Sequence, residues 1–272
     1  MIIDAHHHYW DPARGDYFWM VGEALQPIAR KFGPVDMAAH LEGHGIARTI
    51  LVQAAPTVAE TDYLLGLAAA TDHVAKVVGW VDFEKRDDIA QLERLRKHPK
   101  FAGVRPMIQD LPDPEWMHRA DVQWAFDALV DLDLTFDALG FPQHLEPFLR
   151  LFERYPSLRA VVDHGMKPEI RDGRMEPWSA GIARIAKNTA AFCKLSGFAN
   201  EAAPGWSIEI LRPYAAHILQ VFGPNRVMWG SDWPVVELNG SYDIWYCAAR
   251  QLVPEAQHGA VFGESAAKFY RI

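Results

Sequence analysis

Short runs of apolar residues recur along the chain, and most are followed by a segment with helical periodicity. The runs are four to eight residues long and rich in Val, Ile, Leu and Phe, which is typical of buried strands. They predict eight strands, at residues 2–6, 49–53, 74–81, 101–106, 134–138, 158–163, 191–195 and 226–229. Apolar residues spaced three or four apart predict the helices, at residues 63–70, 89–95, 122–130, 145–155, 182–187, 208–222 and 264–270. Asp36 is predicted to cap a further short helix that ends near Gly43 and Gly45.

A regular alternation of strand and helix over about 250 residues is typical of an α/β fold of the (β/α)8 TIM-barrel type. The alternative is a doubly wound open sheet. That fold would be favoured by a G-x-G-x-x-G turn after a strand, and the sequence has none. No internal repeat and no Pro/Gly/Ser-rich linker divides the chain, so a single barrel domain over residues 1–272 is expected.

The composition and net charge of the chain argue against several classes of function. Half of the residues are hydrophobic and 23% are charged, as in ordinary globular proteins. The net charge of −8 argues against nucleic-acid binding, because a phosphate backbone needs a basic surface. No apolar run reaches the ~18 residues of a membrane span, and no leader-like segment begins the chain. The two cysteines, Cys193 and Cys247, form no C-x-x-C pair, which favours a reducing compartment such as the cytoplasm.

Polar and ionisable residues stand at the end of nearly every predicted strand. Side chains alternate along a strand, so His6 and His8 project to one side while His7 points away and is expected to be structural. In a barrel, the carboxyl ends of the strands carry the chemistry. The other polar or aromatic residues at these ends are Gln53, Trp80, Asp82, Arg105, Asp137, His164, Ser196 and Asp232. Their shared position predicts an active site at this end of the barrel.

A long stretch at residues 9–34 follows the first strand and contains Trp10, Tyr17, Phe18 and Trp19. Long loops in compact domains are often lids or binding loops, so this stretch is a candidate cover for the site. An equally good interpretation is that its aromatic residues cover the core. The chain has no G-x-S-x-G, P-loop or H-E-x-x-H motif, so serine-triad, nucleotide-binding and zincin functions have no support.

Several short motifs occur together and in order along the whole chain. They are Asp-Ala-His-His-His-Tyr-Trp at 4–10, Gly-Val-Arg at 103–105, Val-Asp-His-Gly-Met-Lys-Pro at 162–168, Lys-Leu-Ser-Gly at 194–197, Gly-Ser-Asp-Trp-Pro at 230–234 and Ser-Ala-Ala-Lys-Phe-Tyr at 265–270. Each motif alone is weak, but the ordered set resembles the amidohydrolase superfamily. It is most similar to the sugar-lactonase branch, which includes L-fuconolactonases and L-rhamnonolactonases and is related to pyrone dicarboxylate lactonase.

This resemblance implies that His6, His8, His164 and Asp232 form the catalytic set and the ligands of any divalent metal, zinc being the expected ion. Arg105 stands where binuclear members of the superfamily have a bridging lysine, and Asp137 stands where they have a histidine. A binuclear centre is therefore not expected. The resemblance also implies that lactonases of this branch are able to work without a metal.

The expected reaction is attack of water on a lactone carbonyl, which opens a sugar-acid lactone. Asp232 is the expected general base, because an ordinary aspartate is ionised at neutral pH. Arg105, Lys167 or the histidines would stabilise the oxyanion. The residues expected to contact substrate hydroxyls are Arg105, Lys167, Gln53 and Asp137, and those expected to pack on the sugar ring are Trp10, Trp80 and Trp233. For each tryptophan, packing in the core is an equally good interpretation.

Two other functions stay open at this point. One is a metal-dependent decarboxylase or amide hydrolase of the same superfamily, and the other is a carbohydrate-binding barrel without catalysis. The expected partner is a small-molecule sugar lactone. Its stereochemistry, its ring size and the oligomeric state of the protein do not follow from the sequence.

Overall fold

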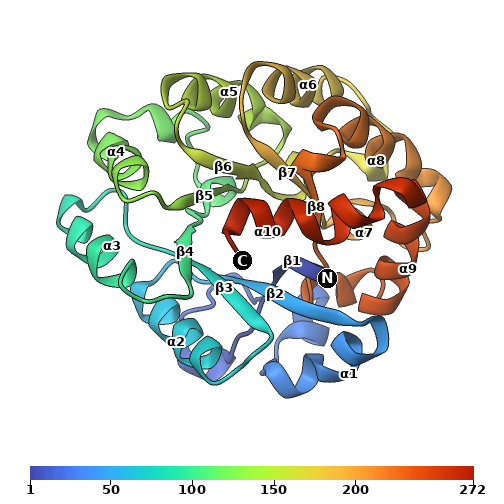
Figure 1. Cartoon of the computed structure of the whole chain (residues 1–272), viewed down its shortest axis with the longest axis horizontal. Helices are drawn as coiled ribbons and strands as arrows, with labels where there is room; N and C mark the ends of the chain where they lie inside the picture. The colour runs from blue at the N-terminus through green and yellow to red at the C-terminus, as the bar shows by residue number, and fades with distance from the viewer.

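The computed structural model describes all 272 residues, and eight parallel strands follow one another around a barrel in chain order (Figure 1). The strands are β1 (Ile2–His7), β2 (Ile46–Val52), β3 (Val74–Gly79), β4 (Phe101–Val104), β5 (Thr135–Ala138), β6 (Arg159–Val162), β7 (Phe192–Leu195) and β8 (Val227–Trp229). The predicted (β/α)8 fold and all eight strands are confirmed.

Helices surround the barrel, except for the last one, α10, which crosses one end of it (Figure 1). They are α1 (Pro34–His44), α2 (Val58–Ala69), α3 (Ile89–Leu95), α4 (Gln123–Asp131), α5 (Leu145–Arg154), α6 (Trp178–Asn188), α7 (Phe198–Glu201), α8 (Ile208–Phe222), α9 (Tyr242–Leu252) and α10 (Ser265–Tyr270). Short 3-10 turns join many of them. None of the helices is both long and apolar enough to cross a membrane.

One helical prediction needs correction, and one helix was missed. Helix α1 begins at Pro34, and Asp36 lies inside its first turn, where its carboxylate accepts a hydrogen bond from Gly33 N at 2.9 Å. Asp36 therefore caps the helix from its third position and not from the residue before it. Helix α9 was not predicted, although Ser241 caps it by accepting a hydrogen bond from Ile244 N. The apolar residues of α9 lie among mixed residues after the eighth strand, and their helical periodicity was not recognised.

The residues after β8 close the barrel against β1. Asp232 N donates to His6 O at 2.8 Å, and His8 N donates to Trp233 O at 2.7 Å. Gly230 lies where a Cβ atom would come within 2.6 Å of His6 Cβ, so only glycine allows this approach. Closure through backbone hydrogen bonds fixes Asp232 beside the two histidines of the first strand.

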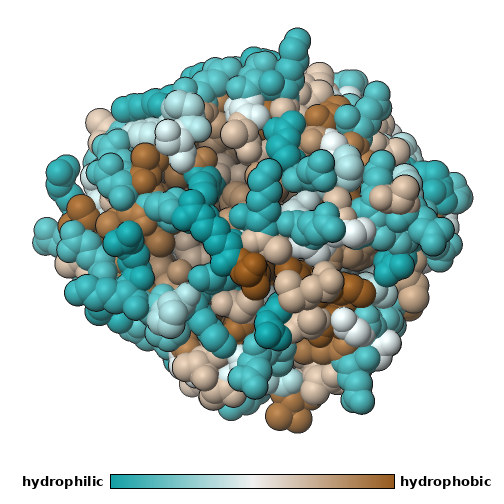
Figure 2. Space-filling view, viewed as in Figure 1, coloured by the Kyte–Doolittle hydropathy of each residue, from teal (hydrophilic) through white to brown (hydrophobic).

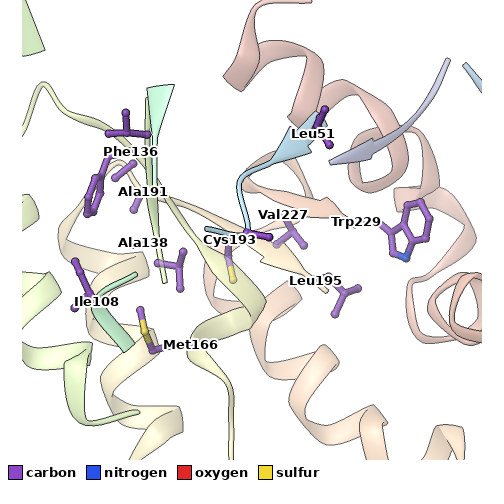
Figure 3. Packing of buried hydrophobic residues seen from close by; sticks show 14 of the residues in the cluster. Leu51, Ile108, Phe136, Ala138, Met166, Ala191, Cys193, Leu195, Val227 and Trp229 are labelled. Atoms are coloured by element: carbon purple, nitrogen blue, oxygen red, sulfur yellow. The ribbon is translucent and has the colours of Figure 1, made fainter. Parts of the chain in front are cut away.

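The apolar core has two parts, as expected for strands with one face toward the helices and one toward the barrel axis. The larger part lies between the sheet and the helices, and Figure 3 shows a portion of it that includes Cys193, Leu195 and Val227. The smaller part fills the barrel and includes Phe269 and Tyr270 of α10. Helix α10 crosses the barrel on the side seen in Figure 1, and hydrophilic residues predominate at the periphery of this face in Figure 2.

Candidate active site

A cavity of about 310 Å³ lies at the carboxyl ends of the strands. Its wall combines apolar side chains with a small number of polar groups, which is the usual composition of a site for a small molecule. Six of the residues predicted from the sequence line it: His8, Trp10, Arg105, His164, Lys167 and Asp232. The structure therefore brings together residues from the first, fourth, sixth and eighth strand ends.

Three histidines surround one oxygen of Asp232. The distances to Asp232 Oδ1 are 3.4 Å from His8 Nε2, 3.7 Å from His6 Nε2 and 3.9 Å from His164 Nε2. The ring of His6 lies between the other two, with centroids 4.9 Å from His8 and 4.5 Å from His164. His6 is fully buried, so it forms the floor of the site below the cavity.

Hydrogen bonds on the far side of each ring hold the histidines in place. His8 Nδ1 lies 2.8 Å from Val52 O, which only accepts, so Nδ1 carries the proton in neutral His8 and Nε2 turns a lone pair toward Asp232. His164 Nδ1 lies 2.8 Å from Ser196 Oγ. His7 points to the other face, where its Nε2 lies 2.9 Å from Thr49 Oγ1. The expected structural role of His7 agrees with this position.

The backbone of the site adopts left-handed conformations that side chains rarely take. Asp232 has a φ of 57°, and the turn after β6 contains His164 at 52° and Lys167 at 48°. Such a conformation costs a residue other than glycine about 1 kcal/mol or more. Strained residues of this kind cluster at functional sites, and here they aim the side chains of His164 and Asp232 toward each other.

Gly197 provides the space that His164 needs. It has a φ of 72°, and a Cβ atom at this position would come within 2.8 Å of His164 Nδ1. The Gly197→Ala variant is therefore expected to displace the His164 ring and its bond to Ser196, lowering kcat/KM about 100-fold, as a displacement of about 1 Å can do. Steady-state kinetics would measure this, with Gly43→Ala, where no atom lies nearby, as the matched control. Unchanged kinetics in a folded Gly197→Ala protein would contradict the assigned place of His164.

The three histidines keep Asp232 ionised. Burial alone would raise its pKa, but the neighbouring His164, His8 and His6, which favour the carboxylate over the protonated acid, outweigh burial and hold the pKa below its ordinary value. Burial lowers the pKa of His164 to about 4. At neutral pH, Asp232 is therefore a carboxylate and His164 a neutral imidazole.

Arg105 reaches into the cavity from the end of β4. One of its Nη groups donates to Gln53 O, and the other lies 3.6 Å from Asp163 Oδ2. Its buried Nε–H has no hydrogen-bond partner in the chain. A guanidinium with a free donor beside a carboxylate and three histidines is suited to hold an oxygen atom of a bound molecule.

The stretch at residues 9–34 forms one wall of the cavity, and its buried aromatic residues Trp10 and Tyr17 also belong to the core. Trp10, Trp19 and Leu25 all line the cavity. Trp10 Nε1 donates to Ile28 O at 3.1 Å and to Arg30 O at 3.0 Å, and Trp19 Nε1 donates to Ala54 O at 2.7 Å. These bonds fix both indoles, so the wall has a defined shape.

Four residues predicted to contact substrate do not line the cavity. Trp80 lines a neighbouring cavity of about 280 Å³, and Trp233 is buried edge-to-face against Phe32 at 5.2 Å. Gln53 is buried and donates to Arg105 O at 2.6 Å, so it positions the backbone of Arg105. Asp137 lies inside the barrel. Gln53, Trp80 and Asp137 stand at strand ends, as predicted, but none of the four side chains lines the cavity.

Sequence reasoning also missed several site residues. Lys194 and Asp163 belong to the family motifs but are not among the predicted site residues. Both lie buried beneath the histidines. Gln109 and Asp110 line the cavity from the loop after β4, and Gln109 Oε1 accepts a hydrogen bond from Lys167 Nζ at 2.6 Å. The inward position of Lys194 follows from strand alternation, because Cys193 and Leu195 on either side of it pack outward.

The donor set fits one divalent cation. Ligand atoms of His6, His8 and Asp232 lie within 4.8 Å of one another. Nitrogen and carboxylate ligands suit zinc, and the free lone pair of His8 Nε2, with Nδ1–H bonded to a carbonyl, is the arrangement that metal-bound histidines usually show. A second such group, His6, Asp163 and His164, shares His6 with the first, and Arg105 and Asp137 occupy the fourth and fifth strand ends.

The amidohydrolase family model matches residues 3–272. The chain belongs to the amidohydrolase family. It is 43% identical to an L-fucono-1,5-lactonase of Burkholderia ambifaria over 99% of this chain and 95% of that protein. It is 30% identical to an L-fucono-1,5-lactonase of Burkholderia multivorans over 99% of this chain and 96% of the other. The resemblance seen in the motifs is thus confirmed.

A solved amidohydrolase structure from Burkholderia multivorans, with bound zinc, superimposes with a TM-score of 0.94. It is 29% identical, and the match covers 100% of this chain and 99% of that one. The zinc of that relative agrees with the histidine and aspartate cluster found here. The zinc of that relative and the ligand set of this chain thus both support a single divalent metal as the cofactor.

Proposed function

We propose that this enzyme hydrolyses a sugar-acid lactone to the free sugar acid, and that L-fucono-1,5-lactone is the first substrate to test. The observation that carries the proposal is the ionised carboxylate of Asp232, placed in a cavity among three histidines and an arginine. Support also comes from the two L-fucono-1,5-lactonases that match the chain over nearly its full length.

Asp232 acts as the general base. A water molecule beside Asp232 attacks the lactone carbonyl carbon, and its proton moves to the carboxylate as the new C–O bond forms. The tetrahedral intermediate then collapses, the bond from the carbonyl carbon to the ring oxygen breaks, and the departing oxygen takes the proton from Asp232. The product is a hydroxy acid, and the base is regenerated.

Fixed donors stabilise the oxyanion of the intermediate. The guanidinium of Arg105 provides one such donor, and Lys167 Nζ at the same cavity wall provides another. Preorganised donors in a site shielded from water contribute strongly to acyl-transfer catalysis. A neutral His164 beside Asp232 completes the polar side of the site.

A divalent metal, when bound, would acidify the attacking water and polarise the carbonyl. His8, Asp232 and either His6 or His164 would hold it. The residues above provide a base and oxyanion donors from the chain itself. We therefore propose that the metal assists the reaction and is not required for it.

The sugar is bound between an aromatic wall and a polar wall. The fixed indole of Trp19 faces the apolar side of the ring and is backed by the fully buried Trp10, while Lys167, Gln109 and Asp110 are placed to bond its hydroxyls. The two cysteines are free thiols, which is consistent with the reducing, cytoplasmic compartment that we propose.

A panel of aldonolactones, assayed with a pH indicator before and after chelation, tests this function. We expect acid release from L-fucono-1,5-lactone and stereochemically related lactones, and most of the rate should persist in protein shown by elemental analysis to be free of metal. Inactivity on every sugar lactone would refute the lactonase assignment. Complete loss on chelation, restored by zinc, would instead establish an obligate metal.

A further inference from the structure

Asp4 is a fully buried carboxylate that the proposed reaction does not use and that forms no ion pair with Lys or Arg. Its Oδ1 accepts hydrogen bonds from Ser231 N at 2.8 Å and from His6 N at 3.2 Å. Its Oδ2 accepts from the hydroxyl of Tyr242, the first residue of α9, at 3.1 Å. Burial raises the pKa of Asp4 to about 6, so the group stays in the interior against a loss of hydration. One carboxylate therefore connects β1, the loop after β8 and α9.

The bond from His6 N to Asp4 lies within a β-bulge of the first strand. The register of β1 against β2 shifts between Asp4 and His7, so that three steps along β1 correspond to two along β2. Bulges disrupt the backbone ladder locally and re-aim side chains, and they are frequent next to active sites. Here Ala5 packs in the part of the core that fills the barrel, and the next residue, His6, also turns to the interior, where it contacts Lys194. Asp4 thus supports the bulge that directs His6 into the site.

The bond from Ser231 N to Asp4 lies next to the strained backbone of Asp232. Asp232 follows Ser231 directly and has a left-handed φ of 57°, a conformation that persists only where the surrounding structure holds it. Asp232 N donates to His6 O at 2.8 Å, and Trp233 N donates to Ser231 Oγ at 3.0 Å. Asp4 Oδ1 accepts the third N–H of this turn, that of Ser231. A single oxygen atom thus ties the backbone of His6 to the backbone that precedes Asp232.

We propose that Asp4 is a positioning residue, and that its Oδ1, shared by the N–H groups of His6 and Ser231, sets the place of Asp232 relative to His6. The kinetic consequence rests on the proposed lactonase function, but the shared hydrogen bonds do not. The role requires an oxygen that accepts two N–H groups and does not require a negative charge. This requirement distinguishes it from an electrostatic role and from a proton relay, both of which need a carboxyl group.

The variants Asp4→Ala and Asp4→Asn separate the acceptor from the charge. Both remove the charge, but asparagine keeps an oxygen for the two N–H groups and turns its NH2 toward the hydroxyl oxygen of Tyr242, which can accept. We expect kcat for lactone hydrolysis to fall about 100-fold in Asp4→Ala, as a displacement of about 1 Å at the site can cause. Asp4→Asn should recover most of this loss. KM should change little in either variant, because Asp4 does not line the cavity.

Asp88→Ala is the matched control for a general loss of stability. Asp88 is also buried, and its Oδ2 accepts from a backbone N–H, that of Asp82, at 3.1 Å, but it does not line the cavity. This control should keep the parental kcat. A folded Asp4→Ala protein with the parental kcat would overturn the proposal. A loss of about 100-fold in Asp4→Asn would also overturn it, because the acceptor is still present, and this result does not depend on whether Asp4→Ala folds.

Hydrogen exchange of the Ser231 amide, followed by NMR, tests the shared hydrogen bonds without a substrate. Relative to Asp88→Ala, exchange at Ser231 should be about 10-fold faster or more in Asp4→Ala, because the turn then opens locally, and it should stay slow in Asp4→Asn. Unchanged exchange in Asp4→Ala, or lost protection in Asp4→Asn, would overturn the positioning role whatever the substrate. If Asp4→Ala exchanges faster but the parental protein opens no lactone, the hydrogen bonds are upheld and the lactonase function is refuted.

Discussion

Replacing Asp232 with asparagine is expected to lower kcat for lactone hydrolysis by a factor of about 10³, within the range usual for loss of a general base. Asparagine keeps the size of the side chain but cannot accept the proton of the attacking water. The pKa of Asp232 lies below its ordinary value, so the wild-type residue is ionised throughout the neutral range and the variant removes that charge entirely. KM should change much less than kcat, because the amide still fills the same space.

The experiment requires a matched control and a check of folding. Asp131→Asn is suitable because Asp131 is exposed at the end of α4 and does not line the cavity. Both variants are compared with the parental protein by steady-state kinetics and thermal unfolding. A folded Asp232→Asn protein that turns over lactones at the parental rate would refute the mechanism.

Replacing Arg105 with lysine is expected to lower kcat/KM about 10² to 10³-fold, the loss seen when an oxyanion donor is removed. Lysine keeps the positive charge, but its single ammonium cannot bond Gln53 O, remain near Asp163 and also present a donor to the cavity. The effect should fall mainly on kcat, because the oxyanion exists only in the transition state and intermediate.

Arg86→Lys provides the control for this prediction, since Arg86 is exposed in the turn before α3. Initial rates over a range of lactone concentrations separate kcat from KM in both variants. A rise in KM alone for Arg105→Lys would assign Arg105 to ground-state binding of hydroxyls and not to the oxyanion.

It was predictable that His6 and His8 project to the same side of the first strand, because the alternation of side chains along a strand is a local rule. The same rule placed His7 on the opposite face, where it bonds Thr49. Placing His164 and Asp232 in the same site as these two histidines required only the barrel fold and the position of each residue at a strand end. These predictions succeeded because they depend on neighbours along the chain and on one global rule of the fold.

The tryptophans illustrate the limit of this reasoning. Trp10, Trp80 and Trp233 looked alike in sequence, yet one lines the cavity, one lines a second cavity and one is buried beside Phe32. Their positions depend on the path of loops whose direction is set by packing between distant segments. Local pattern carries no information on that packing.

The sequence by itself determined the barrel, the end at which the site lies and the identity of the histidine and aspartate set. These features follow from periodicity, strand alternation and the order of the motifs. Only the tertiary structure decided that Asp137 supports Lys194, that Lys194 contacts His6 and that Gln53 holds Arg105. The reason is physical: a buried charge takes its role from partners within about 4 Å, and those partners come from strands 50 or more residues apart.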